Sequence, residues 1–155
     1  MNTEMLFVSI FNTLIGNLEV VHDEHFIFNV CFSKKSGEPA KNRLAHFIAY
    51  ELKSYFDNPH HRFQLSLKPQ GSIFQQKVWN ALLVIPVGRT ITYGELASKL
   101  QSSPRAIGQA CKSNPLALFI PCHRVVGKND IGGYMGNPES ITYKKSLLAH
   151  EAEAT

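Results

Sequence analysis

Apolar residues recur with two different periods in this chain, and the period changes at about residue 40. Before that point, three short runs rich in β-branched and aromatic residues are separated by Asn12, Gly16 and a polar stretch, which is typical of strands. We place these strands at Leu6–Ile10, Ile15–Val21 and Phe26–Phe32. Alternation in the third strand puts four side chains on one face: Phe26, Phe28, Val30 and Phe32.

The spacing after residue 40 is helical. Apolar side chains at Leu44, Ile48, Leu52 and Tyr55 predict a helix over about 41–56, which Asp57-Asn58-Pro59 ends. Residues 60–71 show little periodicity, and we interpret them as a linker in which His60 and His61 are solvated. The first third of the chain is therefore a small sheet plus a helix.

Helix-start signals cluster in the second half of the chain. A helical pattern begins at Ile73 and ends before Pro86 and Gly88. The sequence Thr92-Tyr93-Gly94-Glu95 has the spacing of a capping box and predicts a helix over Tyr93–Leu100. Ser103-Pro104 predicts a second helix that runs to about Lys112. Two short helices joined by a turn form a helix-turn-helix, although a plain helical hairpin inside a core gives the same pattern.

The last part of the chain adds a short buried run over 118–120, a turn over 127–130 and a closing helix that starts near Asn137-Pro138. We therefore expect an α/β (α+β) protein of two lobes, residues 1–69 and 70–155.

Charge is distributed unevenly between these lobes. Residues 1–69 carry seven Lys/Arg and seven Asp/Glu, whereas residues 70–151 carry nine and four, a net charge of +5. A basic lobe beside a neutral one favours a polyanionic partner such as nucleic acid. Ordinary surface charge that serves solubility remains the alternative.

Three cysteines, an odd number without CxxC spacing, argue against a disulfide framework and a zinc ribbon. We interpret Cys31 and Cys111 as packing residues. No apolar run approaches the ~20 residues that span a bilayer, and the first residues lack the basic cluster of a signal peptide. We expect a cytoplasmic, monomeric protein with no metal, no cofactor and no membrane partner.

Cys122 is followed directly by His123, a pairing that can support nucleophilic chemistry. A free thiol has a pKa of ~8.5 and needs a base to attack at neutral pH, especially a base that a third group orients. Glu151 is a candidate for that third group, and Asn114 could brace a turn before Cys122. The pair alone also fits an inert, buried cysteine.

The residues around this pair resemble the O6-alkylguanine-DNA alkyltransferase family. The resemblance rests on several ordered motifs, which together are specific. They are Phe74-x3-Val78-Trp79, Pro86-x-Gly88, Thr92-Tyr93-Gly94-Glu95-Leu96-Ala97, Pro104-Arg105-Ala106-Ile107-Gly108, Asn114-Pro115, Pro121-Cys122-His123-Arg124-Val125-Val126 and Leu147-Leu148-Ala149-His150-Glu151. They cover residues 70–151, while residues 1–69 match only in general shape.

The resemblance implies a ribonuclease-H-like first lobe and a winged helix-turn-helix-like second lobe. It implies stoichiometric transfer of an alkyl group from O6-alkylguanine, and from O4-alkylthymine, in double-stranded DNA to Cys122 after base flipping. The implied catalytic residues are Cys122, His123, Glu151, Asn114 and Tyr93, the last as proton donor to guanine. The implied DNA-binding residues are Gln75, Thr92, Tyr93, Gly94, Arg105, Ala106, Gly108 and Lys112, with Arg105 replacing the flipped nucleotide. The implied pocket residues are Pro121, Val125, Tyr134 and Lys144.

Two other functions remain open at this point. A helix-turn-helix regulator without chemistry would keep Cys122 unreactive, and a cysteine hydrolase would turn over a small ester or peptide with Cys122 and His123. Relatives that only sense damage lack the cysteine, so Cys122 argues against that class.

Overall fold

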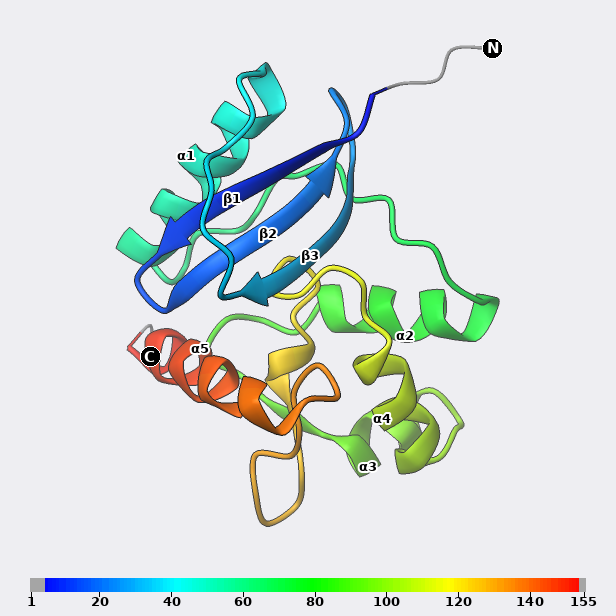
Figure 1. The fold of residues 1–155 in the computed structure, drawn as a ribbon. Coiled ribbons are helices and arrows are strands. Elements are labelled where there is room, and N and C mark those ends of the chain that lie inside the picture. The colour runs from blue at the N-terminus through cyan, green and yellow to red at the C-terminus, as the bar shows by residue number, and fades with distance from the viewer. Residues whose placement is uncertain (1–4, 154–155) are drawn as a thin grey trace.

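The computed structural model describes residues 5–153, and its first elements form an antiparallel three-stranded sheet (Figure 1). β1 (Phe7–Thr13), β2 (Gly16–His22) and β3 (Ile27–Ser33) lie in the order β1-β2-β3. α1 (Arg43–Asp57) packs against this sheet and begins at Asn42, whose side chain accepts a hydrogen bond from Ala45 N. The first third of the chain is thus the sheet plus helix that its sequence predicts.

The alternation predicted for the third strand is wrong at its start. Val21 pairs with Asn29 but His22 pairs with Ile27, so Phe28 is the extra residue of a β-bulge. A bulge shifts by one residue which side chains face the core. Ile27 and Val30 are therefore buried, Phe28 is half-buried, and Phe26 precedes the strand and is 38% exposed.

Strand bounds also differ at the first hairpin. β1 continues past Ile10 to Thr13, because Asn12 pairs with Asn17 across the turn. The turn itself is Leu14-Ile15, so Ile15 does not belong to β2 as the sequence pattern predicted. A polar residue in an edge strand has its side chain in water, so Asn12 does not end the strand.

The linker interpretation of residues 60–71 is wrong in part. This extended segment packs alternate side chains, Phe63, Leu65 and Leu67, against the core, and Leu67 bridges Ile27 in parallel. His61 is not a solvated residue, because its Nε2 lies 2.7 Å from the buried Glu51 carboxylate. The segment binds the edge of the sheet instead of joining two lobes loosely.

The first three helices of the second half begin where the sequence predicts. They are α2 (Ile73–Leu83), α3 (Tyr93–Lys99) and α4 (Pro104–Lys112). Ser72, Thr92 and Ser103 each accept a backbone hydrogen bond three residues ahead. α3 and α4 pack together as a helix-turn-helix. The closing helix starts later than predicted: Pro138–Ser140 form only a 3-10 turn, η2, and α5 is Ile141–Ala152.

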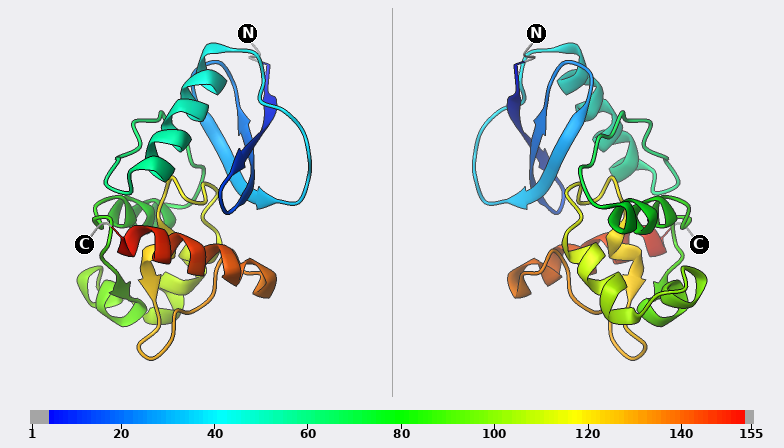
Figure 2. Two further views of the ribbon diagram at one scale, coloured as in Figure 1. Left: turned by 90° about the vertical axis from the view of Figure 1, so that its left-hand side faces the viewer. Right: turned by 90° about the vertical axis from the view of Figure 1, so that its right-hand side faces the viewer.

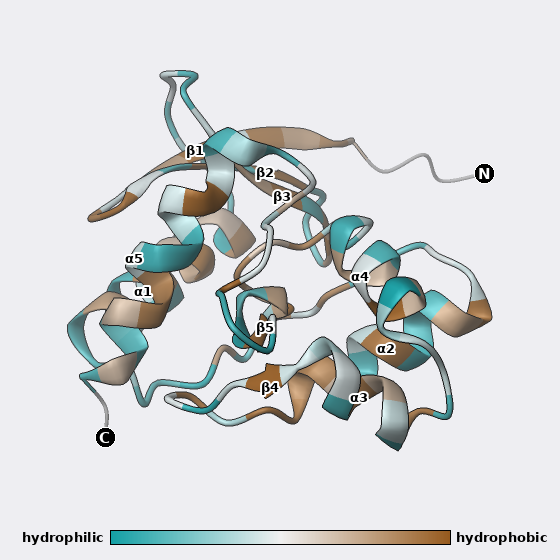
Figure 3. Cartoon of the chain, turned by 90° about the horizontal axis from the view of Figure 1, so that it is seen from below, coloured by the Kyte–Doolittle hydropathy of each residue, from teal (hydrophilic) through white to brown (hydrophobic). Residues whose placement is uncertain are grey.

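A short parallel pair connects the helix-turn-helix to the segment that holds the Cys-His pair. β4 (Ile91–Thr92) precedes α3, and β5 (Val125–Val126) follows the 3-10 turn η1 (Cys122–Arg124). Ile91 pairs with Val125 and Thr92 with Val126. Seen from below, β4, β5 and α2–α4 gather on one side of the molecule (Figure 3). Tyr93 and Cys122 are thereby brought to neighbouring positions.

Backbone bonds also join the two halves of the chain. The sheet and α1 lie on one side and α2–α5 on the other (Figure 2). Between them, Val30 N donates to Pro115 O and Ala117 N donates to Val30 O, at 2.8 and 3.2 Å. The loop that precedes Cys122 is thus anchored on β3.

Candidate active site

Cys122 opens a single 3-10 turn, and Asn114 fixes the loop before it. Asn114 Oδ1 accepts from Leu116 N and Asn114 Nδ2 donates to Ile120 O, both at 2.9 Å. Asn114 is 3% exposed, so these bonds replace water as partners of its amide. The loop of residues 114–120 consequently presents Cys122, itself buried, in a fixed position.

Glu151 gathers three partners beneath this turn. Its carboxylate accepts from His123 Nε2 at 2.8 Å, from Arg124 Nε at 2.8 Å and Nη2 at 3.0 Å, and from Tyr55 Oη at 2.6 Å. Burial alone would raise the pKa of Glu151, but the hydrogen bonds and charges of His123 and Arg124 hold it well below its usual range. Glu151 is therefore an acceptor-only carboxylate at neutral pH.

This assignment fixes the tautomer of His123. Burial lowers the pKa of His123 despite its hydrogen bond to Glu151, so the ring is neutral. Because an ionised Glu151 can only accept, the His123 proton lies on Nε2. The remaining nitrogen, Nδ1, is a buried acceptor without a hydrogen-bond partner among residues 5–153. A base is thus oriented with its free lone pair away from Glu151.

The Cys122 thiol is neutral at rest. Burial raises its pKa, while a hydrogen bond from Asn114 and the charge of Lys144 oppose that rise. A buried thiol of raised pKa is a weak nucleophile until a base removes its proton. The neutral His123 is the candidate for that base.

Lys144, on α5, contacts several elements of the site. Lys144 is fully buried, and its Nζ donates to Val125 O at 2.7 Å and to Gly133 O at 2.9 Å. It also lies 5.8 Å from the centroid of the Tyr93 ring. One cation therefore connects α5 to β5, to the loop that follows β5, and to the start of α3.

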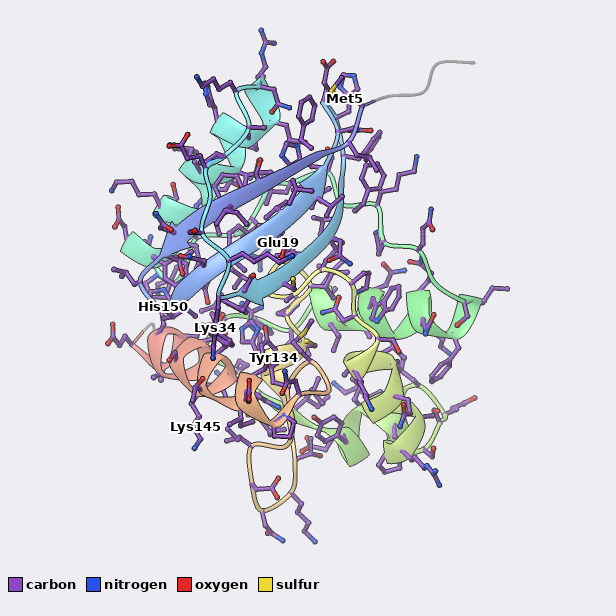
Figure 4. All side chains as sticks on the ribbon, viewed as in Figure 1. Met5, Glu19, Lys34, Tyr134, Lys145 and His150 are labelled. Carbon is purple, nitrogen blue, oxygen red and sulfur yellow. The ribbon has the colours of Figure 1, made fainter. Side chains whose placement is uncertain are left out.

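A cavity of about 190 Å³ opens beside Cys122. One wall comes from the helix-turn-helix and the other from the loop after β5. The lining residues are Tyr93, Gly108, Cys111, Lys112, Cys122, Gly133, Tyr134, Met135 and Gly136. Tyr134 lies where α5, this loop and β3 meet, with its ring 6.4 Å from that of Phe32 (Figure 4). Its buried hydroxyl has no hydrogen-bond partner among the described residues.

Other pocket residues that the resemblance implied lie outside this lining. Val125 and Lys144 do not line the cavity. Lys144 Nζ donates a hydrogen bond to the Val125 carbonyl. Pro121 lines a separate cavity with Arg124 and Phe63. A larger cavity of about 660 Å³ lies between β1 and α1 and includes none of the predicted site residues.

The predicted DNA-binding residues fall into two groups. Seven lie on the helix-turn-helix or its first cap: Thr92, Tyr93, Gly94, Arg105, Ala106, Gly108 and Lys112. Arg105 and Lys112 are exposed to solvent. Lys112 also lines the cavity, as does Gly108. Gln75 lies apart on α2, where its Oε1 accepts from Ser72 N and closes a capping box.

Sequence reasoning missed several residues of the site. Tyr55 was assigned only to the core, yet it binds Glu151 from 96 residues away. Arg124 was quoted only as a motif letter, although it holds Glu151 by two bonds. Cys111 was assigned to packing, but it faces the Cys122 cavity. Arg124 had a usable signal, because a buried carboxylate near a histidine needs a cation.

Two classes of site are absent from the described part of the chain. Residues 5–153 contain no helix long and apolar enough to cross a membrane. The same residues contain no group of three or more His, Cys, Asp or Glu side chains that could hold a metal ion.

Known proteins are similar to this chain along most of its length. The family model described as "6-O-methylguanine DNA methyltransferase, DNA binding domain" matches residues 73–153. A methylated-DNA–protein-cysteine methyltransferase of Methanocaldococcus jannaschii is 50% identical over 145 residues, which cover 90% of this chain and 83% of the relative.

Solved structures extend the likeness to the whole fold. The crystal structure of Mycobacterium tuberculosis O6-methylguanine methyltransferase has a TM-score of 0.85 and 30% identity, and the match covers 97% of this chain and 95% of that one. A structure of the Mycobacterium tuberculosis protein in complex with DNA has a TM-score of 0.82 at 30% identity, covering 96% and 94%. The similarity therefore includes both the sheet and the helix-turn-helix.

Proposed function

The chain belongs to the 6-O-methylguanine DNA methyltransferase family and acts in DNA repair as a methylated-DNA–protein-cysteine methyltransferase, and we propose that Cys122 is the acceptor of one alkyl group from guanine O6 in DNA. The observation that carries this proposal is the free Nδ1 of a neutral, buried His123, which follows directly in the sequence after a thiol that lines a cavity. A base with one lone pair free is what a resting thiol requires.

The proposed reaction begins with the activation of the thiol. His123 Nδ1 takes the Cys122 proton through a water molecule, and the imidazolium that forms faces the ionised Glu151. The thiolate attacks the alkyl carbon, a sulfur–carbon bond forms, and the bond from that carbon to O6 breaks. The product is a thioether that no neighbouring group hydrolyses, so each protein molecule reacts once.

Tyr93 supplies the proton that the leaving guanine needs. Burial, then the charges of Cys111, Cys122 and Asp130, raise the pKa of Tyr93 to about 12, so its hydroxyl stays protonated at neutral pH. Tyr93 lines the cavity, and its ring lies against Gly132 of the loop after β5. A protonated acid within the cavity can neutralise the negative charge that develops on the departing base.

The target carbon reaches the cavity only if the nucleotide leaves the DNA stack, because O6 is not accessible to Cys122 inside a duplex. The helix-turn-helix lies along one wall of the cavity, with Arg105 exposed near the start of α4. We assign Arg105 to the gap that the flipped nucleotide leaves, where it offsets the few kcal/mol of unstacking. Residues 70–155 thus carry the DNA surface, while Tyr55 of the first lobe supports Glu151.

Intact-mass measurement after incubation with a duplex that contains O6-methylguanine tests the proposal. We expect one methyl group per protein molecule, located on Cys122 by peptide mapping, and none on a Cys122→Ser variant that still binds DNA. Methylation of Cys31 or Cys111 in place of Cys122 would overturn the assignment. An unmodified Cys122 in a protein that binds DNA would favour a regulator, and multiple turnovers of an ester would favour a hydrolase.

A further inference from the structure

A second thiol, Cys111, faces the same cavity as Cys122 and has no part in the transfer described above. It lies on α4 one turn after Gly108, so both residues line the cavity from the helix-turn-helix side. The cavity of about 190 Å³ is smaller than the ~300–1,000 Å³ of ordinary small-molecule sites. Because the cavity is small, we infer that a linker of a few atoms can join the Cys111 and Cys122 thiols, which both line it. The third cysteine, Cys31, lies on β3 and does not line it.

The two thiols also influence each other electrostatically. Burial, and then the charge that a Cys122 thiolate would carry, raise the pKa of Cys111 to about 12 against the opposing charge of Lys144. Alkylation turns Cys122 into a neutral thioether. Because the resting Cys122 thiol is neutral as well, Lys144 is the charge that favours ionisation of Cys111 both before and after the transfer.

Lys112 and Gly136 lie against each other at the edge of the lining. Gly136 has φ +67°, and a Cβ added there would meet the Lys112 side chain at 2.6 Å, so the stem of Lys112 lies directly against this loop. Both residues line the cavity. A reactive group held inside faces this lining, in which Cys111 is the second thiol beside Cys122.

Resting on the proposed alkyl transfer to Cys122, we propose that Cys111 is a second acceptor, which captures the far end of a bifunctional alkyl group and closes a bridge between the two sulfur atoms. The substrate class is guanine whose O6 carries a 2-haloethyl group, that is, a leaving group on the carbon next to the transferred one. The protein would thereby remove both reactive ends of the lesion.

The steps balance without an oxidant or a further reactant. Cys122 sulfur bonds to the first carbon, the bond to O6 breaks, and guanine takes a proton from Tyr93. The thioether sulfur then displaces halide from the second carbon and forms a three-membered sulfonium ring. Cys111 sulfur attacks a ring carbon and loses its proton to solvent, and the electron pair of the broken ring bond returns to Cys122 sulfur. The product is Cys122–CH₂–CH₂–Cys111 with free halide.

The test is peptide mapping of the full chain after reaction with duplex DNA that carries freshly prepared O6-(2-chloroethyl)guanine, with O6-methylguanine DNA in parallel. Products are scored only among molecules whose Cys122 has been alkylated, so a change in the rate of the first step does not enter. We expect the wild type and the matched control Cys31→Ser to give mainly the ethylene-bridged pair of peptides. We expect Cys111→Ser to give at least tenfold less bridge and to carry 2-hydroxyethyl on Cys122 instead.

A second measurement, cross-linking of the two thiols, does not depend on the chemical stability of the chloroethyl lesion. Bis-methanethiosulfonate reagents with one- and two-carbon spacers should join Cys111 to Cys122 in the wild type and fail to do so once Cys122 has been methylated by DNA. Hydroxyethyl-Cys122 as the main wild-type product, or a failure of both spacers to join the thiols, overturns the inference while methyl transfer stands. Loss of methyl transfer to Cys122 overturns the proposed function, and the inference with it.

Discussion

Glu151 is the reason that we propose His123 as a base and not as a buried structural histidine. Arg124 and Tyr55 donate to the same carboxylate, so its charge is stabilised before any proton moves. A proton that arrives on His123 Nδ1 then lies on a ring already bonded to an anion, which lowers the cost of a buried imidazolium. Another histidine that binds a carboxylate is His61, whose Nε2 lies 2.7 Å from Glu51 and which does not line the Cys122 cavity.

Replacing His123 tests this assignment at the level of one residue. A glutamine can still donate to Glu151 but offers no basic nitrogen to Cys122. We expect His123→Gln to slow methyl transfer by ~10²–10⁴-fold at neutral pH, the range for loss of a general base. The deficit should shrink as pH rises, because the thiol then ionises without help.

The matched control is His61→Gln, which removes a half-buried histidine that binds the buried Glu51 outside the Cys122 cavity. Its transfer rate should stay within about twofold of the wild type. Single-turnover kinetics across a pH series, read by intact mass, measure both variants. An equal loss for His61→Gln and His123→Gln would show that the effect reflects general stability and not base catalysis.

At the level of elements, the sequence predicted features that depend on neighbouring residues, such as helix starts, and missed features that depend on contacts between distant segments. Caps at Ser72, Thr92 and Ser103 set the starts of α2, α3 and α4, because each signal is complete within a few residues. The bulge at Phe28 and the bond from Tyr55 to Glu151 depend on pairing between distant segments, which no local pattern reports. Cys122, His123 and Glu151 were found by motif, whereas the lining residues Met135 and Gly136 became visible only when the loop was placed against α4.

Arg105 on α4 should separate reaction in DNA from reaction with a free base. If this residue fills the gap of a flipped nucleotide, Arg105→Ala slows repair of duplex O6-methylguanine but has little effect on free O6-benzylguanine, which needs no flipping. We expect a difference of at least tenfold between the two losses, measured by single-turnover rates. Lys112→Ala, at the other end of α4, should mainly weaken DNA binding and make its salt dependence shallower. Equal losses on both substrates would reduce Arg105 to a phosphate contact.

The loop after β5 should tolerate a side chain at one glycine and not at the other. Gly133 has open space around an added Cβ, whereas Gly136 has φ +67° and the Lys112 stem at 2.6 Å. We expect Gly133→Ala to change stability by less than ~0.5 kcal/mol and Gly136→Ala to destabilise by ~1–2 kcal/mol in urea unfolding. Adding Lys112→Ala to Gly136→Ala should recover part of that loss, because the clash disappears and the backbone strain remains. Equal stability of the two alanine variants would contradict the contact.

The whole molecule is organised so that both halves of the chain meet around the Cys122 segment. The loop before Cys122 is hydrogen-bonded to β3, and the segment after it, β5, pairs with β4. From α5, Glu151 binds His123 and Lys144 binds Val125. Trp79 joins this arrangement to the helix-turn-helix by donating from Nε1 to Ala110 O at 2.9 Å. Ionisable groups thus become buried in one place, and their protonation is coupled to folding of the entire chain.

Folding stability should therefore peak between the ordinary pKa values of histidine and cysteine. Burial lowers the pKa of His123 below 6.5, and Glu151 titrates below its usual range, so the unfolded chain binds more protons in acid. Stability consequently falls as pH drops below about 6.5 and falls further as carboxylates protonate.

Above pH 9.0 the sign reverses. Cys111 and Cys122 have raised pKa values, so the unfolded chain loses their protons while the folded protein keeps them. Lys144, whose pKa is lowered, works in the opposite direction, but it is one group against two thiols. Each unbalanced group contributes up to ~1.4 kcal/mol per pH unit. Urea unfolding from pH 5 to 10.5 should show a maximum, and Cys111→Ala should flatten its alkaline side. A wild-type stability that stays level between pH 9 and 10.5 would show that the two thiols are not buried together as described.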